Sequence, residues 1–141
     1  MARALSVLPI IVALAACDPG PAPTKQTVRV VSPEQQQLHQ LDAFNLAIGL
    51  KRAIYDAGYT CKRITEAGFV GTYKNLDMWT AHCVYQTGPG NDWAIFAGPD
   101  GSAQVRDCKD VKSGNASLPA AEKIPECVIK ERPKGSFTDV K

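Results

Sequence analysis

The hydrophobic positions between residues 32 and 57 recur with helical spacing. The segment begins Ser32-Pro33-Glu34-Gln35, where serine can cap a helix, proline suits the first turn and glutamine completes a capping box. Gly58 is a natural left-handed end for such a helix. We therefore expect one N-terminal helix that runs from Ser32 to Ala57.

The apolar side chains of this helix fall into two stripes when they are placed at 100° per residue. The first stripe is Leu38, Leu41, Phe44, Ile48 and Tyr55, and the second is Ala43, Leu46, Ala47, Leu50 and Ile54. One stripe should pack on a sheet. The other is covered by a further part of the chain or by a partner, because uncovered apolar patches usually mark interfaces. Our candidate partner surface on the helix is Leu46, Leu50 and Ile54.

From Tyr59 onwards the pattern changes to short alternating runs separated by turn residues, which is typical of antiparallel strands. We expect strands at residues 59–65, 78–86, 92–97 and 102–108. Turn residues separate them: Gly68, Gly71 and Asn75, then Gly88-Pro89-Gly90, then the hairpin turn Pro99-Asp100-Gly101. The predicted fold class is α+β, with one N-terminal helix packed on a four-stranded antiparallel meander sheet.

Strand alternation assigns the aromatic side chains to faces of this sheet. Trp79 with Tyr85, and Trp93 with Ile95, share the parity that suits the face under the helix. Phe96 has the opposite parity, so it is a second candidate for a partner surface, since aromatic residues dominate the energetics of interfaces. Core packing is the competing interpretation for all of these residues.

The chain becomes polar and irregular after Cys108, and we expect no more than a helical turn near residues 118–120. We expect the folded domain to span residues 32–128, followed by a mobile polar tail at residues 129–141.

Five cysteines are the unusual feature of the composition. Without Cys17 the set is even, and two structural disulfides are predicted for an exported chain. If the first two strands pair around a turn near Thr72, Cys61 lies opposite Cys83, which leaves Cys108 to join Cys127. A metal site or a redox pair is disfavoured because the chain has no Cys-x-x-Cys motif.

The two histidines are the remaining residues with catalytic chemistry. His39 lies on a polar arc of the helix and is expected to be solvated. His82 faces away from the helix side of the sheet, and no motif nominates a carboxylate or a nucleophile beside it. The sequence also lacks the common hydrolase, phosphate-loop and dinucleotide motifs, so we expect neither an enzyme nor a cofactor.

The length and the net charge of the chain limit the number of domains and the classes of function that it can have. The chain of 141 residues has room for one modest domain. Its formal net charge of +2 is not the footprint of a nucleic-acid-binding protein. The short basic pairs Lys51-Arg52 and Lys62-Arg63 are best interpreted as solvated surface, with contact to anionic lipid as the alternative.

The first residues have the pattern of a targeting segment. Arg3 is followed by an apolar run from Ala4 to Ala16, which is shorter than the roughly 20 residues needed to span a bilayer. The run ends in Leu14-Ala15-Ala16-Cys17. This ending resembles the lipobox of bacterial lipoproteins. The resemblance covers only the first residues, and the body of the chain suggests no family.

The resemblance implies cleavage between Ala16 and Cys17 and lipidation of Cys17, which would anchor the chain in a membrane. In lipoproteins an aspartate after this cysteine often favours the inner membrane, so Asp18 favours that membrane over the outer one. Residues 1–16 are then a signal peptide and residues 17–31 a proline-rich tether.

We thus expect a lipid-anchored, non-catalytic binding or accessory subunit on the periplasmic face of a bacterial membrane. Its partners would be the membrane, through the lipid, and a membrane or envelope protein. The alternative is a small inhibitor or ligand-binding module that acts on envelope hydrolases or cell-wall fragments. A third hypothesis, an enzyme with an unfamiliar site, would need a deep polar pocket around His82.

Overall fold

The computed structural model describes residues 31–137. The expected signal peptide, the motif at Cys17, Asp18 and residues 17–30 of the tether lie outside these residues, as do residues 138–141. The elements are α1 (Pro33–Gln40), α2 (Ala43–Asp56), β1 (Arg63–Tyr73), β2 (Leu76–Val84), β3 (Asn91–Ala97), β4 (Ala103–Asp107), α3 (Cys108–Asn115) and the 3₁₀ turn η1 (Ala120–Glu122).

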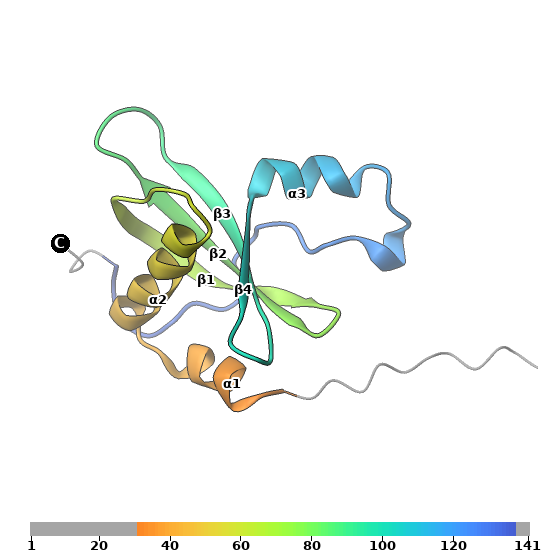
Figure 1. The fold of residues 1–141 in the computed structure, drawn as a ribbon, viewed down its shortest axis with the longest axis horizontal. Coiled ribbons are helices and arrows are strands. Elements are labelled where there is room, and N and C mark those ends of the chain that lie inside the picture. Colours follow the sequence, from red (N-terminus) through yellow and green to blue (C-terminus); the bar gives the residue numbers. More distant parts are fainter. Residues whose placement is uncertain (1–30, 138–141) are drawn as a thin grey trace, which may run out of the picture.

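The four strands form one antiparallel sheet in the order β1-β2-β3-β4. Helix α2 lies on one face of this sheet, while α3 lies on the other side (Figure 1). The predicted α+β class and meander are therefore confirmed. The expected ends of the second, third and fourth strands differ from the observed ones by at most two residues.

The single helix expected over residues 32–57 is wrong, because the chain breaks between α1 and α2. The capping box at Ser32 and Gln35 starts α1 as predicted. Leu41 then adopts an extended conformation, and the side chain of Asp42 accepts a hydrogen bond from the backbone N–H of Asn45. An aspartate in this place caps a new helix instead of continuing the old one.

Strand β1 begins later and runs much further than the expected strand at residues 59–65. It ends at a two-residue turn, Lys74-Asn75, between the paired residues Tyr73 and Leu76. Gly68 lies inside β1, where the C-terminal segment approaches its backbone closely. A Cβ atom at this position would lie 2.6 Å from the carbonyl oxygen of Glu131. The glycine that suggested a turn is thus a point of close packing.

Side chains on both faces of the sheet are buried. The face under the helices carries Trp79, Ala81, Cys83, Trp93 and Ile95, with Tyr85 packed against them, as the strand parity predicted. The other face carries a second cluster of Val70, Met78, Ala94, Phe96 and Val111. The sheet therefore has a buried apolar cluster on each of its two faces.

The region after Cys108 is more ordered than predicted. Helix α3 starts with Asp107, whose side chain accepts from the N–H of Lys109, and it buries Val111. Residues 130–137, which belong to the tail expected at residues 129–141, make hydrogen bonds to the domain. The Phe69 N–H donates to the Glu131 carbonyl at 2.9 Å, and the Ala43 N–H donates to the Lys134 carbonyl at 2.8 Å.

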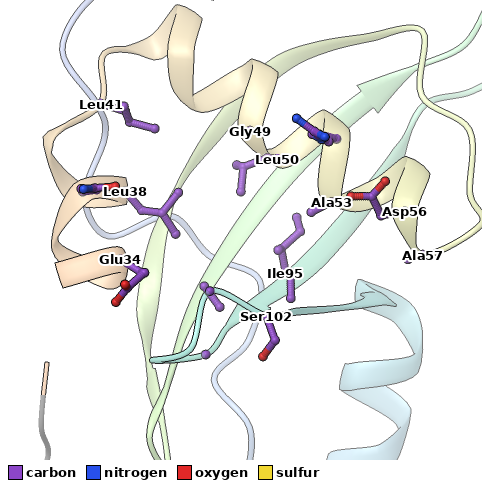
Figure 2. Close-up of a pocket in the computed structure, with 16 residues that line it drawn as sticks. Glu34, Leu38, Leu41, Gly49, Leu50, Ala53, Asp56, Ala57, Ile95 and Ser102 are labelled. Atoms are coloured by element: carbon purple, nitrogen blue, oxygen red, sulfur yellow. The ribbon is translucent and has the colours of Figure 1, made fainter. Parts of the chain in front are cut away.

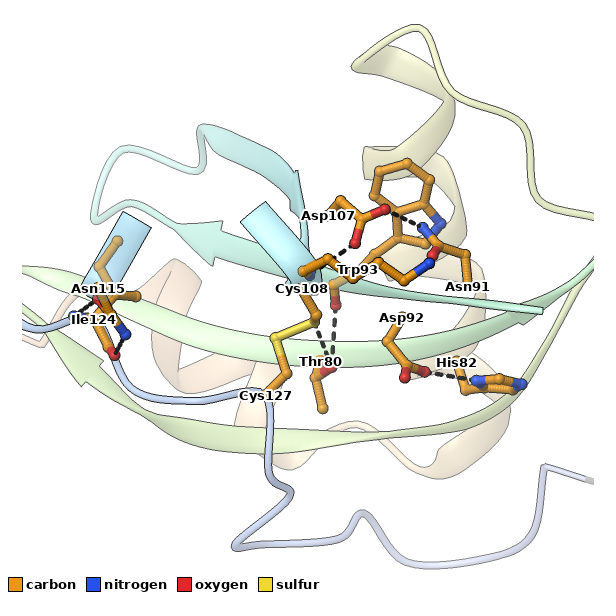
Figure 3. Close-up of a disulfide and its surroundings, with 11 residues drawn as sticks. Thr80, His82, Asn91, Asp92, Trp93, Asp107, Cys108, Asn115, Ile124 and Cys127 are labelled. Carbon is orange, nitrogen blue, oxygen red and sulfur yellow. Dashed lines mark hydrogen bonds and ion pairs between the residues drawn. A yellow bond between two sulfur atoms is a disulfide. The ribbon is translucent and has the colours of Figure 1, made fainter. Parts of the chain in front are cut away.

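Both predicted disulfides are present. Cys61 lies two residues before β1 and joins Cys83 of β2, with Cα atoms 5.6 Å apart. The expected register is wrong, because Ile64 lies opposite Cys83 and the chain turns at Lys74-Asn75 instead of near Thr72. Cys108 joins Cys127 with Cα atoms 6.0 Å apart and so ties the start of α3 to the C-terminal segment (Figure 3).

Polar side chains fasten α1 to the ends of the strands. Gln35 is buried, and its amide donates to the carbonyls of Asn75 and Ala97. His39 Nε2 lies 3.1 Å from Oδ2 of the fully buried Asp77, and its ring packs against Phe69 and Trp79. His39 keeps part of the expected contact with solvent, since its side chain is 31% exposed, but the bond to Asp77 also holds α1 on the sheet.

Candidate functional site

A groove with a volume of about 540 Å³ lies between the two N-terminal helices and the β3–β4 hairpin (Figure 2). Its size falls within the range of about 300–1,000 Å³ that is usual for ligand sites. Its apolar lining consists of Leu38, Leu41, Leu50, Ala53, Ala57, Ile95, Ala97 and Ala103, and its polar lining of Glu34, Gln37, Arg52, Asp56 and Ser102. Sequence reasoning did not nominate this groove.

The floor of the groove belongs to the protein core. Leu50 and Ile95 are 2% and 1% exposed, so they form a rigid apolar base. The ionisable lining residues Glu34, Arg52 and Asp56 are exposed. A ligand in the groove would therefore bury apolar groups on the floor and meet charges of both signs near its edge.

The break in the chain between the two helices lets α1 and α2 supply different walls. Glu34, Gln37 and Leu38 come from α1, and Ala53 and Asp56 come from α2. Figure 2 shows Leu38 and Leu41 on one side of the groove and Ala53 and Asp56 on another. One straight helix would have carried all of these side chains on a single axis, so it could have supplied only one wall of the groove.

Gly49 lines the groove and has no side chain that could fill it. It lies in the middle of α2, where glycine costs about 0.5–1 kcal/mol relative to alanine. A Cβ atom placed on Gly49 would meet nothing within 4 Å among residues 31–137. Close packing therefore does not explain why this position has no side chain. A glycine inside a helical pattern is a sequence signal that could have pointed to this groove.

Strand β4 is the edge of the sheet, and its first residue borders the groove. It pairs with β3 and has no second strand partner in the described part of the chain. Ala103, the first residue of β4, and Ser102 just before it line the groove. An edge strand presents unpaired backbone N–H and C=O groups, which are a template for another extended segment.

The β3–β4 turn that closes one end of the groove is held by Asp100. Its Oδ1 accepts from the Ser102 hydroxyl at 2.6 Å and from the Ser102 N–H at 3.1 Å. The Ser102 hydroxyl, and after it the backbone N–H, lower the pKa of the Asp100 carboxyl from its usual value. The carboxylate form that holds the turn therefore persists to lower pH than in an unstructured chain.

The residues proposed from the sequence as a partner surface are buried instead. Leu46, Leu50 and Ile54 are at most 2% exposed because they are the stripe that packs on the sheet. Phe96 is 4% exposed because α3 and the C-terminal segment cover its face of the sheet. Only Leu50 reaches the groove, where it forms part of the floor.

His82 lies away from the helix side, as expected, and lines a depression of about 300 Å³ with Asp92, Thr80, Glu66 and Arg132. Its Nδ1 is 2.6 Å from Asp92 Oδ1 (Figure 3). The carboxylate therefore orients the ring, which sequence reasoning missed. Both side chains are open to water, at 39% and 58% exposure, and the Thr80 hydroxyl is engaged with the Trp93 carbonyl.

A search of residues 31–137 finds no group of three or more His, Cys, Asp or Glu side chains that could hold a metal ion. Over the same residues, no helix combines the length and apolar character needed to cross a membrane. Comparison with family models, curated proteins and solved structures finds no significant match to this chain.

Proposed function

We propose that this chain is a non-catalytic binding module, held on the periplasmic face of a bacterial membrane by a lipid on Cys17, which takes an extended segment of an envelope protein into the groove. The lipobox-like order Leu14-Ala15-Ala16-Cys17 supports the anchor. The groove beside the edge strand β4 supports the binding role, and this is the observation that carries the proposal.

An extended peptide suits this site better than a compact ligand because two kinds of contact are available side by side. The free edge of β4 can pair with the main chain of the peptide, which supplies affinity that does not depend on sequence. Alternate side chains of the same peptide would then reach the floor at Leu50 and Ile95, which selects apolar residues.

The binding role is favoured over catalysis by where the ionisable groups lie. Glu34, Arg52 and Asp56 are the charged residues of the groove, and all three are exposed to solvent. Catalytic acids and bases are usually desolvated and placed against a charge partner, which tunes their proton affinity. These three side chains instead resemble the polar rim of an interface.

The second candidate, a module that binds cell-wall fragments or inhibits envelope hydrolases, is favoured only by the volume of the groove, which also fits a small molecule. It predicts a ligand without main-chain pairing to β4. The same experiment separates the two candidates.

We expect Gly49→Leu to block the groove while the fold stays intact. The Cβ atom of the new side chain meets nothing within 4 Å in the described chain, and leucine favours a helix by about 0.8 kcal/mol over glycine, so thermal stability should not fall. A photo-crosslinking amino acid at Ala103 should join the groove to one defined stretch of a partner in living cells. A synthetic peptide of that stretch should bind the wild-type chain and lose about tenfold or more in affinity to Gly49→Leu.

Gly114→Leu is the matched control, because Gly114 is also helical and a Cβ atom there also meets nothing within 4 Å in the described chain. This variant should bind the peptide as the wild type does. If the crosslinks scatter over many proteins, or if Gly49→Leu binds the peptide normally, the groove is not the site. Crosslinking to a glycan in place of a polypeptide would favour the second candidate.

A further inference from the structure

Helix α2 has an apolar stripe that the sheet does not cover. Phe44, Ile48 and Tyr55 are 47%, 49% and 49% exposed, although the other flank of the same helix is fully buried. At 100° per residue these three side chains lie within about 40° of one another, so they share one strip of the helix, with Lys51 between Ile48 and Tyr55. Large aromatic and aliphatic side chains gathered this way indicate a contact surface.

Basic residues flank this strip. Lys51 is on α2, and Lys62 and Arg63 are at the start of β1, and all three line a recess of about 230 Å³ together with Phe44 and Ile48. Lys51 Nζ donates to the backbone carbonyl of Lys62 at 2.7 Å, which holds the Lys51 ammonium beside the start of β1. We call the exposed strip, together with these three basic residues, the α2 surface.

The acidic side chains on the neighbouring segments either lie on another flank of α2 or are engaged in a helix cap or an ion pair. Asp42 caps the first turn of α2, Asp56 lines the groove on a different flank of the helix, and Glu66 forms an ion pair with Arg132. The α2 surface therefore combines apolar side chains with an excess of positive charge.

We propose that the α2 surface lies against an anionic lipid bilayer. An apolar strip that inserts between headgroups, flanked by lysine and arginine that reach lipid phosphates, is the usual chemistry of interfacial helices. Tyr55 fits this environment because its ring is apolar and its hydroxyl is polar; here the hydroxyl donates to the Cys61 carbonyl.

This inference rests on the anchor proposed at Cys17, which supplies proximity. Residues 18–31, even fully extended, reach no more than about 50 Å, so an anchored domain stays near the lipid. Tethering raises the effective concentration of the membrane, and a modest surface then suffices for contact.

The orientation leaves the groove open. Gly49 and Asp56, which line the groove, point roughly 100–130° away from the exposed strip around the axis of α2. When the α2 surface lies on lipid, the groove therefore opens sideways along the membrane, where an envelope protein can enter it.

The test uses the full-length chain carrying Cys17→Ala, so that an effect of the acyl chains is excluded. Sedimentation with phosphatidylcholine vesicles, and with the same vesicles containing phosphatidylglycerol, measures the preference for anionic lipid at low and at high salt. We expect a clear preference for the anionic vesicles that falls with salt. The triple variant Lys51→Gln/Lys62→Gln/Arg63→Gln should reduce it about tenfold or more.

The matched control removes the same charge from the other side of the sheet, with Lys109→Gln/Lys112→Gln/Lys123→Gln, and should retain the preference. Residues 1–16 are present in every variant, so their contribution cancels in the comparison. Equal binding to both vesicles, or equal loss in the two triple variants, would overturn the proposal. So would a stable dimer in solution that Phe44→Ser/Ile48→Ser dissolves, because the strip would then face a second copy. Failure of this test leaves lipidation of Cys17 to be judged by its own measurement.

Discussion

Replacing Cys61 and Cys83 together by alanine should lower the free energy of unfolding by about 3 kcal/mol, because their disulfide closes a loop between residues 22 positions apart. Both cysteines are fully buried in the cluster under the helices, so the lost sulfur contacts add to the effect. Urea unfolding followed by tryptophan fluorescence measures the change, since Trp79 and Trp93 lie in the same cluster.

The double variant Cys108→Ala/Cys127→Ala is the comparison. These two cysteines pack at the margin of the second cluster and are half-buried, so the loss should be smaller and should concentrate in the C-terminal segment. Equal losses for the two double variants would contradict the view that the first disulfide belongs to the central core and the second to the attached segment.

Gly68→Ala should release the C-terminal segment from β1 and cost about 1–3 kcal/mol in the free energy of unfolding. The added Cβ atom would lie 2.5 Å from Ile129 Cγ2 and 2.6 Å from the Glu131 carbonyl oxygen, a backbone atom that cannot rotate aside. The hydrogen bonds between Phe69 and Glu131 should therefore open first. Amide hydrogen exchange of Phe69 and Lys130 measures this directly.

Gly114→Ala controls for the change of residue type, because its Cβ atom meets nothing within 4 Å in the described chain and should leave stability the same or higher. If Gly68→Ala exchanges its Phe69 amide no faster than the wild type, the segment does not depend on close approach at this glycine.

Several features follow from local pattern, and the sequence was enough to predict them. The capping box at Ser32 depends on the spacing of neighbouring residues. The disulfide partners of Cys61 and Cys108 follow from the order of the strands along the chain, although Cys61 itself lies just before β1. The assignment of Trp79 and Trp93 to the helix face followed from strand alternation.

Other features depend on contacts between distant segments. Gly68 suggested a turn because nothing nearby in the sequence reveals that residues 129–131 pack against it. His39 looked solvated because its partner Asp77 is on another element. The pattern alone makes Leu46, Leu50 and Ile54 a candidate partner surface, because two apolar stripes on one helix cannot be ranked without the sheet in place.

The groove was missed for the same reason, since three separate elements build it. Two local signals were nevertheless present: Asp42, which caps a second helix, and Gly49, which interrupts a helical pattern without any need from packing.

The claim on which the functional account depends most is that the domain is held at a membrane by lipid. The intact mass of the protein extracted from membranes, measured beside a Cys17→Ala variant, tests it most directly. We expect a chain that begins at Cys17 and carries acyl groups, with both the cleavage and the added mass lost in the variant. An unmodified chain that still begins at Met1, or a wild-type mass that differs from the variant only by the substituted side chain, would contradict it.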